Sequence, residues 1–189
     1  MRLTVCGRLH PAEPKPVEVV LINRRRPRNI RFIVSALRVQ REWCKVTLID
    51  AAPTPDYATD EQTRDAVDRY VTIREHDGCN GFFLPLSRAT APFLYFHQDT
   101  ALPGRYLLLA YLREMEAHPE NGVLAQAGFT GGHFVRREIL AEWWRLMLSN
   151  GEHDPMHLLE TAARNAGFGA AVVRPRSPQE SAGQQQLPQ

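Results

Sequence analysis

Residues 93–104, FLYFHQDTALPG, hold the pattern from which the fold is inferred. Four apolar or aromatic residues are followed at once by His97, Gln98 and Asp99, and then by a Pro-Gly pair. Continuous apolar runs are typical of strands buried in parallel sheets, and ligands collect beyond the carboxyl ends of such strands. The stretch therefore predicts a buried strand that ends at a site, although an ordinary strand that ends in a solvated turn has the same pattern.

The remainder of the chain alternates between strand-like and helix-like segments. Strands or extended segments are expected at residues 17–23, 45–50, 69–75, 92–97, 123–129, 131–137 and 169–176. Helices are expected at residues 27–41, 61–67, 83–91, 103–122, 137–151 and 154–168. Such alternation predicts an α/β fold with a mostly parallel central sheet covered by helices on both faces. We expect an irregular segment at 1–16, one domain at 17–176 and a disordered tail at 177–189.

The composition narrows the class of protein. The chain has 189 residues, a charged fraction of 23% and a net charge of +2, which suits a single water-soluble domain and does not by itself indicate a nucleic-acid binder. No apolar run is long enough to span a membrane, and the first residues lack the apolar core of a signal peptide, so a cytoplasmic location is expected. Three cysteines that are far apart suit neither a disulfide framework nor a zinc site.

The basic residues are almost all arginine, since Lys15 and Lys45 are the only lysines. Arginine binds phosphate groups with two parallel hydrogen bonds, so the composition permits a phosphate-bearing ligand. Several arginines follow the first expected strand, in the segment RRRPR, although an exposed run of charge at a helix start is also common.

Three expected strands end in polar residues: Asn23, Asp50 and Asp99. The carboxyl ends of parallel strands lie at one edge of the sheet, so we expect two carboxylates and an amide along one crevice.

At this point the chain resembles a known family. The succession VEVVLINRRRPRNI, KVTLIDAA, SRATAPFLYFHQDTALPGRYL, GGHFVRREIL and GEHDPMHLLETAARNAGF is similar to a family 2 glycosyltransferase of the GT-A fold. The resemblance covers roughly residues 17–175, and it lies in the order and spacing of the motifs. It implies a Rossmann-like three-layer sandwich that binds a nucleotide-diphospho-sugar.

The resemblance also implies roles for individual residues. Asp50 would contact the base or ribose, and Asp99 would bind Mn²⁺ or Mg²⁺ at the diphosphate. His97 stands where the family has the first Asp of its Asp-x-Asp motif, and it is assigned to the metal as well. Structural alternatives remain open: Asp50 capping the turn that follows it, and His97 hydrogen-bonded at the edge of the sheet. The expected nucleotide-sugar-binding residues are Asn23, Arg24, Asp50, Asn80, Gly81, Gln98 and Gly132.

The proposed general base of the reaction is Asp154, which the resemblance aligns with the second acid of the family's Glu-Asp pair. The alternative is that Asp154 caps a helix, because Pro155 suits the first helical turn. Trp143 and Trp144 are candidates for stacking on a sugar, or for packing in the core.

The predicted function is therefore a metal-dependent, inverting glycosyltransferase. Its partners would be a nucleotide-diphospho-sugar donor and an unidentified acceptor: a glycan, a small molecule or DNA. The alternatives are a degenerate, non-catalytic nucleotide-sugar-binding module and a phage-type enzyme that glycosylates DNA bases. A nucleotidyltransferase ranks lower, because no glycine-rich run follows the first strand. The sequence does not indicate the oligomeric state.

Overall fold

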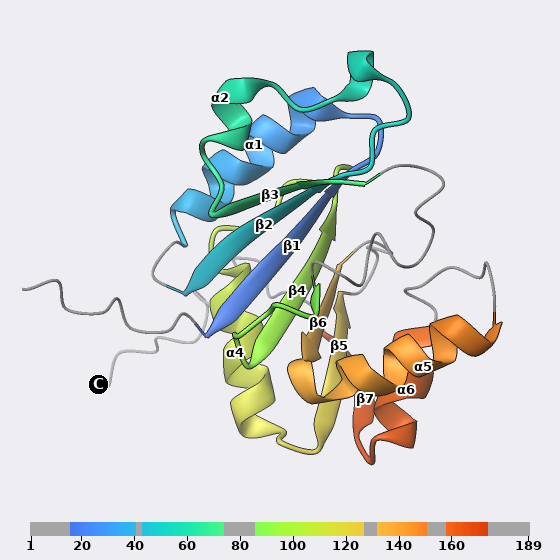
Figure 1. Cartoon of the computed structure of the whole chain (residues 1–189). Helices are drawn as coiled ribbons and strands as arrows, with labels where there is room; N and C mark the ends of the chain where they lie inside the picture. Colours follow the sequence, from blue (N-terminus) through green and yellow to red (C-terminus); the bar gives the residue numbers. More distant parts are fainter. Residues whose placement is uncertain (1–15, 41–42, 74–85, 127–131, 151–157, 174–189) are drawn as a thin grey trace, which may run out of the picture.

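The computed structural model describes residues 16–40, 43–73, 86–126, 132–150 and 158–173. Within them, seven strands form one sheet in the order β3-β2-β1-β4-β6-β5-β7 (Figure 1). The strands in chain order are β1 (Val17–Asn23), β2 (Cys44–Asp50), β3 (Arg69–Thr72), β4 (Phe93–Gln98), β5 (Asn121–Gln126), β6 (His133–Arg136) and β7 (Gly169–Val173). The predicted α/β class with a mostly parallel central sheet is confirmed.

One strand runs against the others. β6 is antiparallel to both of its neighbours, β4 and β5, whereas β1, β2, β3 and β4 are mutually parallel and β7 is parallel to β5. The carboxyl ends of the other six strands therefore share one edge of the sheet, and β6 begins at that edge. We call it the carboxyl edge.

The first helical layer consists of α1 (Pro27–Arg38) and α4 (Leu107–Ala117). The apolar residues of α1 recur at helical spacing, and the four that are buried are Ile30, Ile33, Val34 and Leu37. They pack with β-strand side chains such as Val19 and Tyr95 and with Leu108 of α4 in one apolar cluster. The short helices η1 (Pro55–Tyr57) and α2 (Glu61–Arg64) follow β2, and α2 lies beside α1 (Figure 1).

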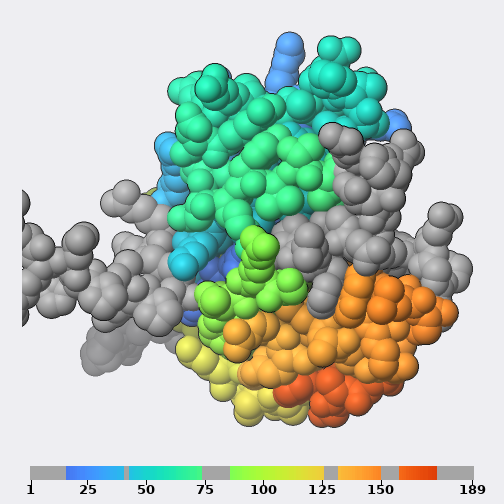
Figure 2. Space-filling view, in the orientation of Figure 1, coloured from blue at the N-terminus to red at the C-terminus, as the bar shows by residue number. Residues whose placement is uncertain are grey.

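The second helical layer, on the opposite face of the sheet, consists of α5 (Leu140–Asn150) and α6 (Leu158–Asn165). The short helix η3 (Arg137–Ile139) leads into α5. Trp143 is fully buried in this layer and meets Phe96 edge-on, with ring centroids 5.3 Å apart. It is therefore a core residue, and the idea that it stacks on a sugar is wrong. Figure 2 shows the outer surface of this layer, with α5 and α6 in the lower half of the view.

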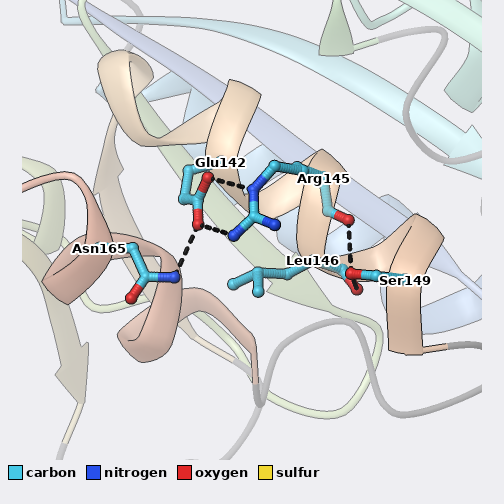
Figure 3. Close-up of polar contacts among 5 residues, drawn as sticks. All are labelled: Glu142, Arg145, Leu146, Ser149 and Asn165. Atoms are coloured by element: carbon cyan, nitrogen blue, oxygen red, sulfur yellow. Dashed lines mark hydrogen bonds and ion pairs between the residues drawn. The ribbon is translucent and has the colours of Figure 1, made fainter.

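Side-chain contacts join α5 to α6 at the surface of this layer (Figure 3). The carboxylate of Glu142 accepts two hydrogen bonds from the guanidinium of Arg145, of 2.6 and 2.7 Å, and a third of 2.6 Å from Asn165 of α6.

Most of the predicted elements are present, with different bounds. The expected helix at 27–41 ends at Arg38, the one at 61–67 is limited to Glu61–Arg64, and the expected strand at 69–75 ends at Thr72. The helix within 103–122 begins at Leu107 and ends at Ala117, directly before the helix-breaking pair His118-Pro119, and β5 begins at Asn121. Residues 1–15, 83–85 and 174–189 lie outside the described residues. The rest of the expected helix at 83–91 is wrong: after Leu86 the chain forms a turn, in which the N–H of Ala89 donates to the carbonyl of Leu86, and residues 87–91 are not helical. Within the described part of the chain, no helix has both the length and the apolar character needed to cross a membrane.

Candidate functional site

The polar residues at the strand ends lie along the carboxyl edge, as the sequence predicts. Asn23 is aligned with Asp50 across the β1–β2 pair, and Ile22 is aligned with Gln98 across the β1–β4 pair. Asp99 follows Gln98 directly. The edge therefore carries two carboxylates and two amides on three adjacent parallel strands.

Asn23 and Asp50 form a buried pair at the centre of this edge. Their exposed fractions are 0% and 2%, and the Nδ2 atom of Asn23 donates to the Oδ1 atom of Asp50 over 2.9 Å. The same Nδ2 atom lies 2.8 Å from the carbonyl oxygen of Tyr57 and 3.2 Å from the hydroxyl of Thr59. The pair thus fixes the segment after β2 against the end of β1.

The carboxylate of Asp50 has several further donors. Its Oδ2 atom accepts from the backbone N–H of Thr59 over 2.8 Å and from the hydroxyl of Tyr70 over 2.9 Å, and its Oδ1 atom accepts weakly from the N–H of Ala52 over 3.4 Å. Burial raises the pKa of Tyr70, and the neighbouring Asp50 adds to that shift. These bonds agree with the turn-capping alternative for Asp50, and its contact with a nucleotide stays a prediction.

Asp99 is bound to the loop between β1 and α1. Its Oδ2 atom accepts hydrogen bonds of 3.0 Å from the backbone N–H groups of three consecutive residues, Arg24, Arg25 and Arg26. Its backbone carbonyl accepts a hydrogen bond of 2.8 Å from the Nδ2 atom of Asn29 in α1. Converging N–H groups of this kind form an anion-binding nest, and here the nest holds the carboxylate of Asp99.

The bonds between Asp99 and the loop leave the second carboxylate oxygen of Asp99 and the side chains of the three arginines available to a ligand. The Oδ1 atom of Asp99 makes no hydrogen bond with any described residue, although the side chain is 6% exposed. The side chains of the three arginines are exposed at the surface of the loop, since only their backbone groups face Asp99. A carboxylate oxygen and a group of guanidinium cations therefore occur together at the carboxyl edge.

His97 is buried on the side of the sheet that α1 and α4 cover. Its exposed fraction is 1%; its Nε2 atom lies 2.8 Å from the carbonyl oxygen of Ala101, and its Nδ1 atom lies 2.9 Å from the hydroxyl of Tyr95. Since a carbonyl can only accept, Nε2 carries the proton and Nδ1 accepts from Tyr95. Burial lowers the pKa of His97 and favours this neutral form, despite an opposing effect of the bond to Ala101.

Both nitrogens of His97 thus have protein partners, and a role as metal ligand, which stays a prediction, would require one bond to break. Within the described residues, no cluster of three or more His, Cys, Asp and Glu side chains could hold a metal ion.

The other predicted site residues are placed as follows. Gln98 is half-buried, Arg24 is exposed, and Gly132 is buried immediately before β6. The antiparallel pairing aligns His133 with Phe96, which brings Gly132 to the carboxyl edge beside the end of β4. Asn80, Gly81 and Asp154 lie outside the described residues.

The sequence analysis did not single out three residues that shape this edge: Thr59, Tyr70 and Asn29. Asn29 belongs to the motif RPRN at the start of α1, which carried a signal in the family resemblance. Thr59 and Tyr70 carry no local signal, because their role depends on the fold of the segment between β2 and β3.

Comparisons with known proteins support this architecture. No protein-family model and no curated protein sequence match the chain. Among solved structures, the mannosyltransferase PcManGT from Pyrobaculum calidifontis, in complex with GDP-Man and Mn²⁺, is similar with a TM-score of 0.60 and 16% identity, over 89% of this chain and 59% of that one. This chain thus spans less than two thirds of that neighbour.

Two further structures are similar. The glucosyl-3-phosphoglycerate synthase of Mycobacterium tuberculosis, in complex with Mn²⁺, UDP-glucose and phosphoglyceric acid, has a TM-score of 0.64 and 12% identity, over 89% of this chain and 75% of that one. The 4-diphosphocytidyl-2C-methyl-D-erythritol synthase of Anaerococcus prevotii has a TM-score of 0.63 and 9% identity, over 86% and 90%. At these identities the likeness concerns the fold alone, and the chain has the GT-A fold.

Proposed function

We propose that this protein is a metal-dependent glycosyltransferase of the inverting type, which moves a sugar from a nucleotide-diphospho-sugar to an acceptor hydroxyl. The observation that carries the proposal is the position of Asp99. It ends a buried central strand of a GT-A fold, one of its oxygens is fixed by three N–H groups, and the other makes no bond with the described residues.

The donor diphosphate would lie against the loop between β1 and α1. The exposed guanidinium groups of Arg24, Arg25 and Arg26 supply positive charge there, and arginine suits phosphate oxygens because it donates two parallel hydrogen bonds. Asp99 holds the backbone of all three residues and so determines where their side chains start. Gln98 and Gly132 would line the same edge.

The residues present fit a divalent cation that is shared with the substrate. Mg²⁺ is usually bound by one or two carboxylates together with substrate phosphates, so it does not require a cage of protein ligands. The Oδ1 atom of Asp99 is the hard oxygen donor at this edge, and the donor diphosphate would supply the others. A bound cation would supply positive charge to the diphosphate as it leaves.

The acceptor hydroxyl must lose its proton as it attacks the sugar, which calls for a general base. We assign this role to Asp154, from the resemblance to family 2 glycosyltransferases. The carboxylate of Asp154 would take the proton, while the loop at residues 24–26 holds the leaving nucleoside diphosphate.

Two other functions make different predictions. A degenerate binding module would bind the donor without releasing nucleoside diphosphate. A nucleotidyltransferase, the lower-ranked alternative, would bind a nucleoside triphosphate in preference to a nucleotide sugar. The fold alone does not separate these activities.

The test is a thermal-shift panel with UDP-, GDP- and dTDP-sugars and the matching triphosphates, with and without Mn²⁺ or Mg²⁺. We expect one nucleotide sugar to raise the melting temperature of the wild type only when metal is present, and to leave Asp99→Asn unshifted. Release of nucleoside diphosphate with an acceptor mixture would then establish transfer. A shift by triphosphates alone, or a metal-dependent shift that persists in Asp99→Asn, would contradict the proposal.

A further inference from the structure

The outer side of α1 is unusually basic for a chain of nearly balanced charge. Between Asn23 and Gln40 there are six arginines and no aspartate or glutamate. All six are exposed: Arg24, Arg25, Arg26, Arg28, Arg31 and Arg38. Arg28, Arg31 and Arg38 follow one another along one side of the helix, since residues three, four and seven positions apart share a helical face.

Two hollows lie between α1 and the segment that contains η1 and α2. The larger, of about 420 Å³, is lined by Pro27, Arg28, Arg31, Phe32, Ala58 and Asp60. The smaller, of about 240 Å³, is lined in part by Arg31, Ser35, Arg38 and Gln62. Arg31 lines both, so the hollows lie next to each other along α1, and we call the two together the α1 groove. Figure 1 shows α1 and α2 side by side where it runs.

The aromatic ring of Phe32 lines this groove and is largely exposed to solvent. Phe32 is 63% exposed and lines the larger hollow, one helical turn after Arg28 on the same face of α1. Tyr57, which precedes the lining residue Ala58, is 42% exposed. Exposed aromatic rings next to cationic side chains are the arrangement on which successive bases of a single strand stack.

The charge of the groove is positive. Arg28, Arg31 and Arg38 form no ion pair with any described residue. The one acidic side chain among its lining residues, Asp60, accepts from the N–H and the hydroxyl of Thr63, each over 2.9 Å; these bonds, and the nearby charge of Arg31, lower its pKa and keep it ionised. Three arginines against one aspartate leave the lining of the groove with a net positive charge, which suits a chain of phosphates.

We propose that the α1 groove binds single-stranded nucleic acid, with the guanidinium groups of Arg28 and Arg31 on backbone phosphates and the ring of Phe32 stacked on a base. The groove begins beside the carboxyl edge, where α1 starts, and extends along the helix away from the donor residues. This proposal goes beyond the transfer reaction, and it is tested by measuring nucleic-acid binding, independently of transferase activity.

The experiment is a titration of the full chain into a short fluorescein-labelled oligothymidylate, followed by fluorescence anisotropy at increasing salt. The double variant Arg28→Gln, Arg31→Gln should bind at least tenfold more weakly and lower the slope of log affinity against log salt by about 1.4, since each phosphate contact on a single strand contributes about 0.7. The control Arg113→Gln, at an exposed position of α4, should leave both the affinity and the salt slope unchanged.

A second pair of variants separates base stacking from charge. Phe32→Ala should weaken oligothymidylate binding by about tenfold, the effect of losing one stacked base, while its affinity for inorganic polyphosphate stays unchanged. Leu148→Ala, an exposed apolar position on α5, should change neither affinity.

The proposal is overturned if the wild type does not bind at low salt, or if Arg113→Gln lowers the affinity as much as the double variant. It is also overturned if Phe32→Ala binds oligothymidylate as the wild type does, which would indicate a general polyanion surface. Circular dichroism shows that each variant is folded, and the donor-induced thermal shift, measured on Phe32→Ala, reports separately on the transferase proposal.

Discussion

The Oδ2 atom of Asp99 lies 3.0 Å from the backbone nitrogen of Arg26, so the end of β4 supplies an acceptor to the start of α1. Arg26 is the N-cap residue of α1, and its own side chain makes no capping hydrogen bond. A carboxylate from a distant part of the chain thus stabilises the start of this helix, where negative charge is favoured. Asp99 is also the proposed metal ligand, so two variants are needed to separate its role in stability from its role in metal binding.

Asp99→Asn and Asp99→Ala are expected to separate these two roles. An asparagine keeps one oxygen for the N–H groups at residues 24–26 and replaces the other by an amide that cannot bind metal, so the free energy of unfolding should fall by about 1 kcal/mol or less. Alanine leaves the N–H groups of Arg24 and Arg25 without this acceptor, and Arg26 keeps only its 3.3 Å bond to the Oδ1 atom of Asn23, so the loss should be about 2–3 kcal/mol. Urea unfolding measures both. Equal losses in the two variants would show that the nest does not depend on the acceptor.

Asp50→Ala should be more damaging than the loss of any one of its partners. Asp50 is buried and accepts from Asn23, Thr59 and Tyr70, so its removal takes the acceptor from the N–H of Thr59 and one bond each from Asn23 and Tyr70, at about 3 kcal/mol in total. Tyr70→Phe removes one of these bonds and should cost about 1 kcal/mol. The ratio of the two losses in urea unfolding is the measurement. An Asp50→Ala variant as stable as Tyr70→Phe would mean that water replaces the carboxylate.

The sequence predicts which residues meet at the carboxyl edge but not how they bond. Asn23, Asp50 and Asp99 each end an apolar run, and parallel strands deliver such ends to one edge. The bonds from Asp99 to residues 24–26 require β4 to lie beside β1, and that strand order depends on packing between distant segments.

The positions of His97 and Gly132 likewise depend on the tertiary fold, which the sequence pattern does not predict. Alternation along the strand puts Tyr95 and His97 on one face, yet the bond from His97 to Ala101 depends on the path of the next loop. The reversed direction of β6, which brings Gly132 to the edge, has no signature in its short extended segment.

His97 should make the protein less stable as the pH falls below about 6.5. Burial lowers its pKa in the folded protein, so near the ordinary value of 6.5 the unfolded chain takes up a proton that the folded chain does not. Stability is full above that value and declines below it, by at most about 1.4 kcal/mol per pH unit for one proton. His97→Gln removes the titrating imidazole, so its free energy of unfolding, measured with urea between pH 7.5 and about 5, should depend less on pH than that of the wild type. Parallel profiles for the two proteins would contradict the assignment.

The ion pair between Glu142 and Arg145 should stabilise the protein only at pH values at which Glu142 is ionised. The hydrogen bond from Arg145, aided by that from Asn165, lowers the pKa of Glu142 from 4.5 to about 2. A lowered carboxylate pKa means that the stabilisation is complete above about 4.5 and is lost as the pH falls toward 2. The hydrogen bond from Asn165 to Glu142 joins α6 to α5 (Figure 3). These two helices flank residues 151–157 in the chain, which include Asp154.

Glu142→Gln should therefore lower the melting temperature at pH 7 and have little effect near pH 2. The decrease should be small and should shrink with added salt, because the pair lies at the surface. Glu138→Gln is the matched control, since Glu138 is exposed on the adjacent turn and has no hydrogen bond or ion pair within the described residues. If the two variants lose the same amount at pH 7, the loss reflects the general charge of the helix, and the bond to Asn165 does not hold α6 in place.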